Sequence, residues 1–99
     1  MGASANAAPT ERLKRREHLQ ALAEAINDSV LFASIRRTPA TGNYYLMVHN
    51  RRDHITEKIL CDLAGTVWCY VWPWGNQISP VGSIPMAVAA VRKAFEVDL

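Results

Sequence analysis

The segment at residues 66–72, Thr-Val-Trp-Cys-Tyr-Val-Trp, most limits what this chain can fold into. Its β-branched and aromatic residues strongly favour a strand. Because side chains alternate between the two faces of a sheet, the large aromatic residues fall on one face and smaller apolar residues on the other. The two sets are Trp68, Tyr70 and Trp72 against Val67, Cys69 and Val71. Both faces are apolar, so each face of this strand needs a layer that covers it.

Two earlier segments also have strand character. Residues 29–37 and 44–49 are rich in β-branched and aromatic residues. The string Thr-Pro-Ala-Thr-Gly-Asn between them contains Pro39 and Gly42 and is typical of a turn. These segments therefore predict a hairpin.

The later part of the chain predicts one or two more strands. Residues 54–63 fit either a helix or a strand, but the Ala64-Gly65 dipeptide predicts a tight turn into residues 66–72 and favours a strand from about Lys58. The string Trp-Gly-Asn-Gln from Trp74 predicts another turn. It leads into a short strand at Ile78-Ser79.

Two amphipathic helices are predicted near the ends of the chain. The first is expected to begin at Glu11 after an N-cap at Thr10 and to end at Asn27-Asp28. The second is expected to follow Ser83 as N-cap, with Pro85 in its first turn. Each has an apolar stripe at helical spacing. The stripes are Leu19, Leu22, Ala23 and Ile26 in the first helix, and Ile84, Val88, Val91 and Phe95 in the second.

This pattern predicts an α+β fold, in which an antiparallel sheet of four or five strands is flanked by an N-terminal and a C-terminal helix. A chain of 99 residues with 49% hydrophobic content is enough for one core. Residues 1–9 are rich in Ala, Ser and Asn and are predicted to be a disordered tail. Residues 10–99 are predicted to form a single domain.

The sequence predicts a cytoplasmic protein that does not span a membrane. No apolar run reaches the roughly 18 to 20 residues that a span requires. The N-terminus lacks the features of a secretory signal. Cys61 and Cys69 in such a chain favour a reducing compartment. Since they flank the Ala64-Gly65 turn, they are candidates for a cross-strand disulfide, but two reduced, buried thiols are the favoured interpretation.

The sequence lacks the motifs that carry catalysis or cofactor binding. His18, His49 and His54 do not have metal-ligand spacing, and there is no glycine-rich phosphate loop or nucleophile elbow. We therefore predict no enzymatic activity, no cofactor and no metal site. A cysteine nucleophile at Cys61 or Cys69 is a third hypothesis, and it requires a nearby histidine and a lowered thiol pKa.

The concentration of tryptophan is the most unusual feature of the chain. One hypothesis is that helices cover these rings as core. The other is that the rings form a surface for a protein partner or a second copy, because exposed aromatic patches rarely persist unpaired. The candidate partner-binding residues are Trp68, Tyr70, Trp72 and Trp74.

The basic residues suggest nucleic-acid binding as an alternative. Phosphate binding requires clustered cations, and two arginine pairs each end a strand near a loop, where they would share one edge of the sheet. Against this, the formal net charge is only +2, and a solvated helix face also explains the first basic stretch. The candidates are Arg12, Lys14, Arg15, Arg16, Arg36, Arg37, Arg51 and Arg52.

The string Trp-Pro-Trp-Gly-Asn-Gln-Ile-Ser-Pro begins at Trp72 and precedes an alanine-rich helix that runs to Phe95. Here the chain resembles short uncharacterised actinobacterial proteins in which a Trp-x-Trp-Gly hairpin precedes a C-terminal helix. The similarity extends back to Ile59-Leu60-Cys61. Such proteins often lie beside helix-turn-helix regulators, so the resemblance implies an accessory regulatory role and carries no catalytic residue.

Taken with the missing motifs, these features predict a non-enzymatic protein-interaction or regulatory accessory module that forms a homodimer. Nucleic-acid binding through the basic helix and the arginine-bearing loops is the alternative. The sequence does not identify the partner.

Overall fold

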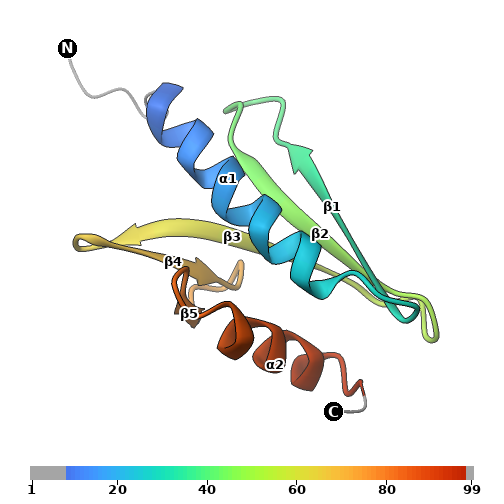
Figure 1. Cartoon of the computed structure of the whole chain (residues 1–99). Coiled ribbons are helices and arrows are strands. Elements are labelled where there is room, and N and C mark those ends of the chain that lie inside the picture. The colour runs from blue at the N-terminus through green and yellow to red at the C-terminus, as the bar shows by residue number, and fades with distance from the viewer. Residues whose placement is uncertain (1–8, 98–99) are drawn as a thin grey trace.

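The computed structural model describes residues 9–97 and confirms the α+β fold (Figure 1). A helix, five strands and a second helix follow one another: α1 (Pro9–Ile26), β1 (Leu31–Arg37), β2 (Tyr44–Asn50), β3 (Thr56–Ala64), β4 (Val67–Val71), β5 (Gln77–Pro80) and α2 (Ile84–Ala94). The predicted tail lies outside the described residues, except for Pro9, which begins α1. No helix in the described part of the chain is long and apolar enough to cross a membrane.

Two predicted caps differ from the structure. Thr10 lies inside α1 rather than at its N-cap, because the helix begins at Pro9, whose fixed φ suits a first turn. Ser83 does stand at the N-cap of α2, but its side chain makes no capping hydrogen bond. Its hydroxyl is therefore not what starts that helix, and Pro85 in the first turn is the remaining local signal.

The five strands form one antiparallel sheet in which each strand pairs with its sequence neighbours. β1 and β2 pair along their whole length, from Leu31 opposite Asn50 to Arg37 opposite Tyr44. β3 pairs with β2 only through residues 56–59 and with β4 through residues 60–64. The sheet is thus two half-sheets joined by one long strand.

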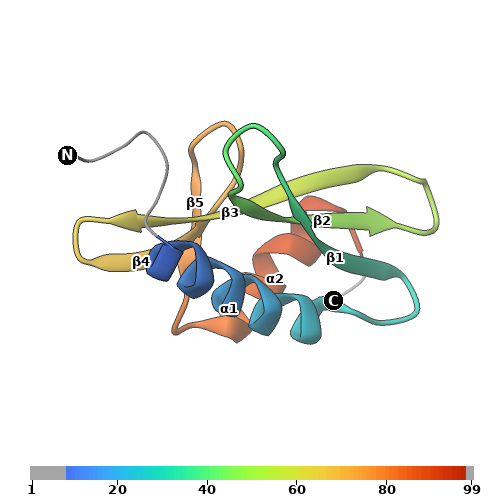
Figure 2. The ribbon, with the colours of Figure 1, turned by 90° about the horizontal axis from the view of Figure 1, so that it is seen from above.

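Both helices lie on the same side of the sheet (Figure 2). α1 contacts β1, β2 and β3, while α2 contacts β5 and α1. The β1–β2 loop and the β4–β5 loop rise on the opposite side, away from the helices (Figure 2). One face of the sheet is therefore covered by the helices, and neither helix lies on the other face.

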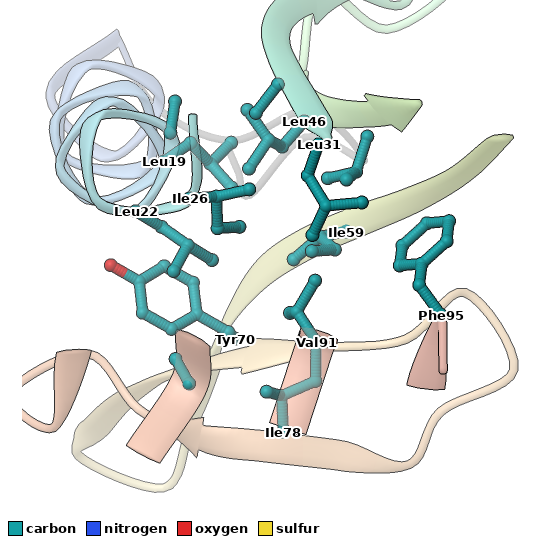
Figure 3. Close-up of a cluster of buried hydrophobic side chains, with 14 of the residues drawn as sticks. Leu19, Leu22, Ile26, Leu31, Leu46, Ile59, Tyr70, Ile78, Val91 and Phe95 are labelled. Carbon is teal, nitrogen blue, oxygen red and sulfur yellow. The ribbon is translucent and has the colours of Figure 1, made fainter. Parts of the chain in front are cut away.

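The hydrophobic core fills the space between the helices and the covered face (Figure 3). The predicted stripe of α1 is buried there at all four positions, including Leu19 and Ile26. Val91 and Phe95 of α2 contribute from the other helix. The sheet supplies residues of the inward-facing set, among them Leu31, Leu46, Ile59 and Tyr70.

Tyr70 joins the sheet to α1. Its side chain is fully buried, and its hydroxyl donates a hydrogen bond of 2.6 Å to the backbone carbonyl of His18. In Figure 3 the hydroxyl oxygen points toward α1. Burial raises the pKa of Tyr70 to about 12. The ring is thus a core residue whose one polar atom is satisfied by the helix.

We expect Tyr70→Phe to lower the free energy of unfolding by about 1 kcal/mol, because it removes one buried hydrogen bond and leaves the ring in place. Urea unfolding at pH 7 measures this change, with an unchanged m-value as the sign that the fold is kept. The raised pKa means that the neutral phenol is favoured in the folded state. The wild type should therefore lose stability as pH rises from 10 toward 12, and the variant less so. Identical stability of the two proteins at pH 7 would contradict this role.

The turn after α1 ties three elements together. The Asn27 side chain accepts a hydrogen bond from the Ala33 backbone N–H at 2.6 Å. One carboxylate oxygen of Asp28 accepts the backbone N–H groups of Val30 and Leu31, at 2.7 and 2.8 Å. The other forms an ion pair of 2.6 Å with Arg92 of α2. The Leu31 hydrogen bond, helped by Val30 and Arg92, lowers the pKa of Asp28.

We expect Asp28→Asn to lower the free energy of unfolding at pH 7 by about 1 kcal/mol, since the amide keeps an acceptor but loses the charge opposite Arg92. A lowered pKa stabilises the fold above the ordinary value of 3.8, and this contribution disappears as pH falls through the lowered value. The difference between variant and wild type should therefore shrink in strong acid. Thermal unfolding at pH 7 and near pH 2.5 tests this, and an equal difference at both pH values would rule it out.

Candidate functional site

The face of the sheet turned away from the helices is rich in apolar residues. Since alternate residues of β1, β2, β3 and β4 point into the core, their neighbours in sequence point outward. Phe32 is 44% exposed and Val67 is 50% exposed, and the remaining large side chains of this face are half-buried. We call this set the outer apolar face: Phe32, Tyr45, Met47, Leu60, Val67 and Val71.

Two cations lie over aromatic rings of the outer apolar face. The Lys58 ammonium is 4.8 Å from the centre of the Tyr45 ring, and the Arg51 guanidinium is 5.4 Å from the centre of the Phe32 ring. In such cation–π contacts the cation lies against the face of the ring while its charged end stays in contact with water. The face therefore combines apolar side chains with cations beside its rings, and Ser34 and Lys58 flank Met47.

The β4–β5 loop presents an exposed tryptophan, Trp74. The loop is closed by hydrogen bonds from Trp72 N–H to the Asn76 carbonyl and from Gly75 N–H to the Trp72 carbonyl. Gly75 has a φ of 104°, which favours glycine. Trp74 stacks on Trp72 with ring centres 5.2 Å apart and ring planes 5° apart. Trp72 is buried, whereas Trp74 is 61% exposed.

The structure does not bring the four predicted partner-binding residues onto one surface. Tyr70 and Trp72 belong to the core. Trp68 is half-buried on the helix-covered side, 5.7 Å from the His18 ring. Of the four residues, Trp74 is the only one that is mostly exposed. The aromatic face of β4 is thus covered by helices, as one of the two sequence hypotheses has it.

Sequence reasoning missed the side chains of the outer apolar face on β2 and β3. Tyr45, Met47 and Leu60 were part of predicted strands, but no sequence signal said which of their faces the helices leave uncovered. The register places Leu60 opposite Val71, and Met47 between Ser34 and Lys58. The alternation within residues 44–49 separates the two faces of this strand, but it does not say which face the helices cover.

The predicted arginine pairs lie at opposite ends of the β1–β2 hairpin. Arg37 stands opposite Tyr44 beside the β1–β2 loop. Arg51 follows β2 at the other end, where its N–H bonds to the Val30 carbonyl at 2.8 Å. The expectation that both pairs share one edge of the sheet is wrong, because an antiparallel hairpin places its turn and its open end a full strand length apart.

Arginines of α1 and β1 instead gather around two aromatic rings. The guanidinium groups of Arg16 and Arg37 lie 5.8 and 5.6 Å from the centre of the Tyr44 ring. The guanidinium of Arg15 lies 5.4 Å from the centre of the Trp68 ring. We call Arg15, Arg16 and Arg37 with these two rings the arginine cluster.

Arg15 occupies the place where β2 and β3 separate. Its Nε donates to the Cys61 carbonyl at 2.8 Å, and its Nη2 pairs with Asp62 at 3.3 Å. Its Nη1 is buried without a hydrogen-bond partner among the described residues. Arg15 therefore replaces a missing strand partner of β3 and keeps one unused donor.

The two cysteines face opposite sides of the β3–β4 hairpin. Cys61 stands opposite Tyr70, while Cys69 stands opposite Asp62, so they are not cross-strand neighbours. Both are free and buried, as the favoured interpretation has it. Burial raises the pKa of the Cys61 thiol to about 12, against a smaller lowering by Arg15. A nucleophile requires a lowered thiol pKa, so Cys61 does not fit that role.

The three histidines contact neighbouring polar or aromatic side chains. The Nδ1 atom of His49 lies 2.9 Å from the Thr56 hydroxyl, and its ring is 5.7 Å from that of His54. His18 lies beside Trp68, and partial burial lowers its pKa. Within residues 9–97, no three side chains of the metal-binding types come together.

Comparison of the chain with protein-family models, with curated proteins and with solved structures gives no match. Function is therefore inferred from the two surfaces described above, the outer apolar face with Trp74 and the arginine cluster.

We expect Cys61 to resist alkylation in the folded protein, because its side chain is buried and a pKa of about 12 leaves little thiolate at pH 8. Iodoacetamide labelling followed by peptide mass spectrometry, in buffer and in concentrated urea, measures this. Glutathione in the same tube gives the rate of an unprotected thiol. Native Cys61 reacting as fast as glutathione would show that the site opens readily.

Proposed function

We propose that this chain is a non-enzymatic protein-interaction module that forms a homodimer through its outer apolar face and Trp74. The observation that supports this most is that α1 and α2 lie on the same face of the sheet. A sheet with apolar residues on both faces needs a layer on each. A second copy supplies the missing layer.

The composition of the outer apolar face suits an interface. Aromatic residues, methionine and arginine are enriched at interfaces. Tyr45 and Met47 lie on β2 within this face, while Phe32 carries Arg51 above its ring. In a two-fold symmetric dimer the same patch meets itself, so the patch must be self-complementary. Apolar side chains meet this condition.

Trp74 offers a further exposed aromatic ring. Its ring rests on the buried Trp72 ring, so that ordering it on binding costs little conformational entropy. Exposed, held aromatic rings are frequent sites of large binding energy. We therefore infer that Trp74 contacts the second copy.

An accessory regulatory role in the cytoplasm belongs to the same proposal. The resemblance at Trp72 to Phe95 motivates the regulatory part. Two buried, unpaired cysteines are consistent with a reducing compartment. A dimer of this kind would act by binding rather than by chemistry.

We expect Met47→Glu to weaken dimerisation by at least tenfold, because it places a charge in the apolar interface. The fold should persist, since the new carboxylate stands opposite Lys58. Ala21→Glu is the matched control, because Ala21 is exposed on α1 on the far side of the molecule. Sedimentation equilibrium from low to high micromolar concentration measures the association, and circular dichroism checks the fold.

Trp74→Ala should weaken the dimer as well, whereas Trp72→Ala should mainly destabilise the fold because Trp72 is core. A wild-type protein that stays monomeric at high micromolar concentration would overturn the homodimer proposal. An Ala21→Glu variant that dissociates as readily as Met47→Glu would place the interface elsewhere.

A further inference from the structure

Charge is distributed unevenly along this chain. Six of the eleven basic residues lie in the first half of α1 or at the end of β1: Arg12, Lys14, Arg15, Arg16, Arg36 and Arg37. The acidic residues near them are three of nine: Glu11, Glu17 and Asp62. This end of the molecule therefore has a formal charge of +3, whereas the remainder has −1. The small net charge conceals a basic end.

Two of the three arginines of the cluster, Arg15 and Arg37, are held in place by hydrogen bonds. Arg37 donates from Nε to the Gly42 carbonyl at 3.2 Å while it lies over Tyr44. Gly42 makes room for this, since a Cβ there would stand 3.2 Å from the Arg37 Nη2 atom, and its φ is 76°. Arg15 is fixed by the Cys61 carbonyl and by Asp62. Held side chains lose less entropy when they bind an anion.

The positive charge of the cluster is not cancelled internally. Asp62 pairs with Arg15, and within the described residues no ion pair involves Arg16 or Arg37. These two guanidinium groups each lie within 6 Å of the centre of the same ring, Tyr44. A phosphate backbone that passes this ring is attracted by both charges. Guanidinium groups match the oxygens of a phosphate with paired hydrogen bonds.

The aromatic rings of the arginine cluster indicate which kind of phosphate-bearing molecule fits it. Tyr44 and Trp68 are half-buried, so each keeps part of its surface toward solvent. Alternating cations and aromatic rings are the arrangement by which proteins hold single-stranded nucleic acid, because phosphates meet the cations and bases stack on the rings. A duplex presents its phosphates but hides the faces of its bases. We propose that the arginine cluster binds single-stranded nucleic acid, a function separate from dimerisation.

Fluorescence anisotropy with labelled oligothymidylate of 20 nucleotides tests the proposal on the full chain. We expect micromolar affinity at 50 mM salt. The logarithm of the association constant should fall with the logarithm of salt concentration with a slope of about −2, as for about three phosphate contacts to a single strand. The double variant Arg16→Glu, Arg37→Glu should bind at least tenfold more weakly.

The control is the double variant Arg52→Glu, Lys93→Glu, which changes the net charge equally at exposed positions away from the cluster. It should stay within about threefold of the wild type, because salt screens charges that lie more than about 10 Å from a bound phosphate. A loss as large as that of the cluster variant would show that only net charge matters and would overturn the proposal.

Stacking is tested separately. Tyr44→Leu keeps an apolar side chain at this position but removes the ring, so it should weaken binding severalfold, as expected for one base stacked on a ring. A labelled duplex of equal length should bind more weakly than the single strand. Equal binding of duplex and single strand, or full binding by Tyr44→Leu, would contradict a single-strand site. Circular dichroism on every variant separates lost binding from lost fold.

Discussion

The exchange of partners along β3 is the constraint on which the rest of the molecule depends. Residues 56–59 belong to the ladder with β2, and residues 60–64 belong to the ladder with β4. Beyond the last β2–β3 pair, Leu46 opposite Ile59, the Cys61 carbonyl has no strand partner in β2. Arg15 supplies that hydrogen bond, and the cost of leaving a buried carbonyl unpaired is avoided. A helical side chain thus completes the sheet, which fixes α1 across the junction of the two half-sheets.

The stripe of α1 that faces the sheet changes character along its length as a result. From Leu19 onward it is apolar and lies over the core. One turn earlier, Arg15 and Arg16 of the same helix meet the diverging hairpins and stand over Trp68 and Tyr44. The core ends where the sheet opens, so the cations there are partly sheltered and still reach the surface. Fold and basic surface therefore have one structural origin.

The order of elements and the core stripe of α1 could be predicted from the sequence, because periodicity reports which residues of one element share a face. It does not report which faces meet. The sequence predicts that Trp68 and Tyr70 share one face of β4. Whether helices or a partner cover that face depends on the side of the sheet on which α1 and α2 pack. Likewise the arginine pairs were visible, but only the register, with Arg37 opposite Tyr44, separates Arg37 from Arg51. The pairing of Arg15 with Cys61 and Asp62, far apart in sequence, had no local signal.

The β3–β4 register affects how the purified protein refolds. Cys61 stands opposite Tyr70, and Asp62 stands opposite Cys69. A slip of one residue between these strands puts the two sulfur atoms directly across from each other and turns Tyr70 out of the core. Under oxidising conditions that mispaired hairpin would be locked by a covalent bond, whereas a reductant leaves it free to slide back. Refolding yield should thus depend on thiol chemistry in a protein whose native fold contains no bond between these cysteines.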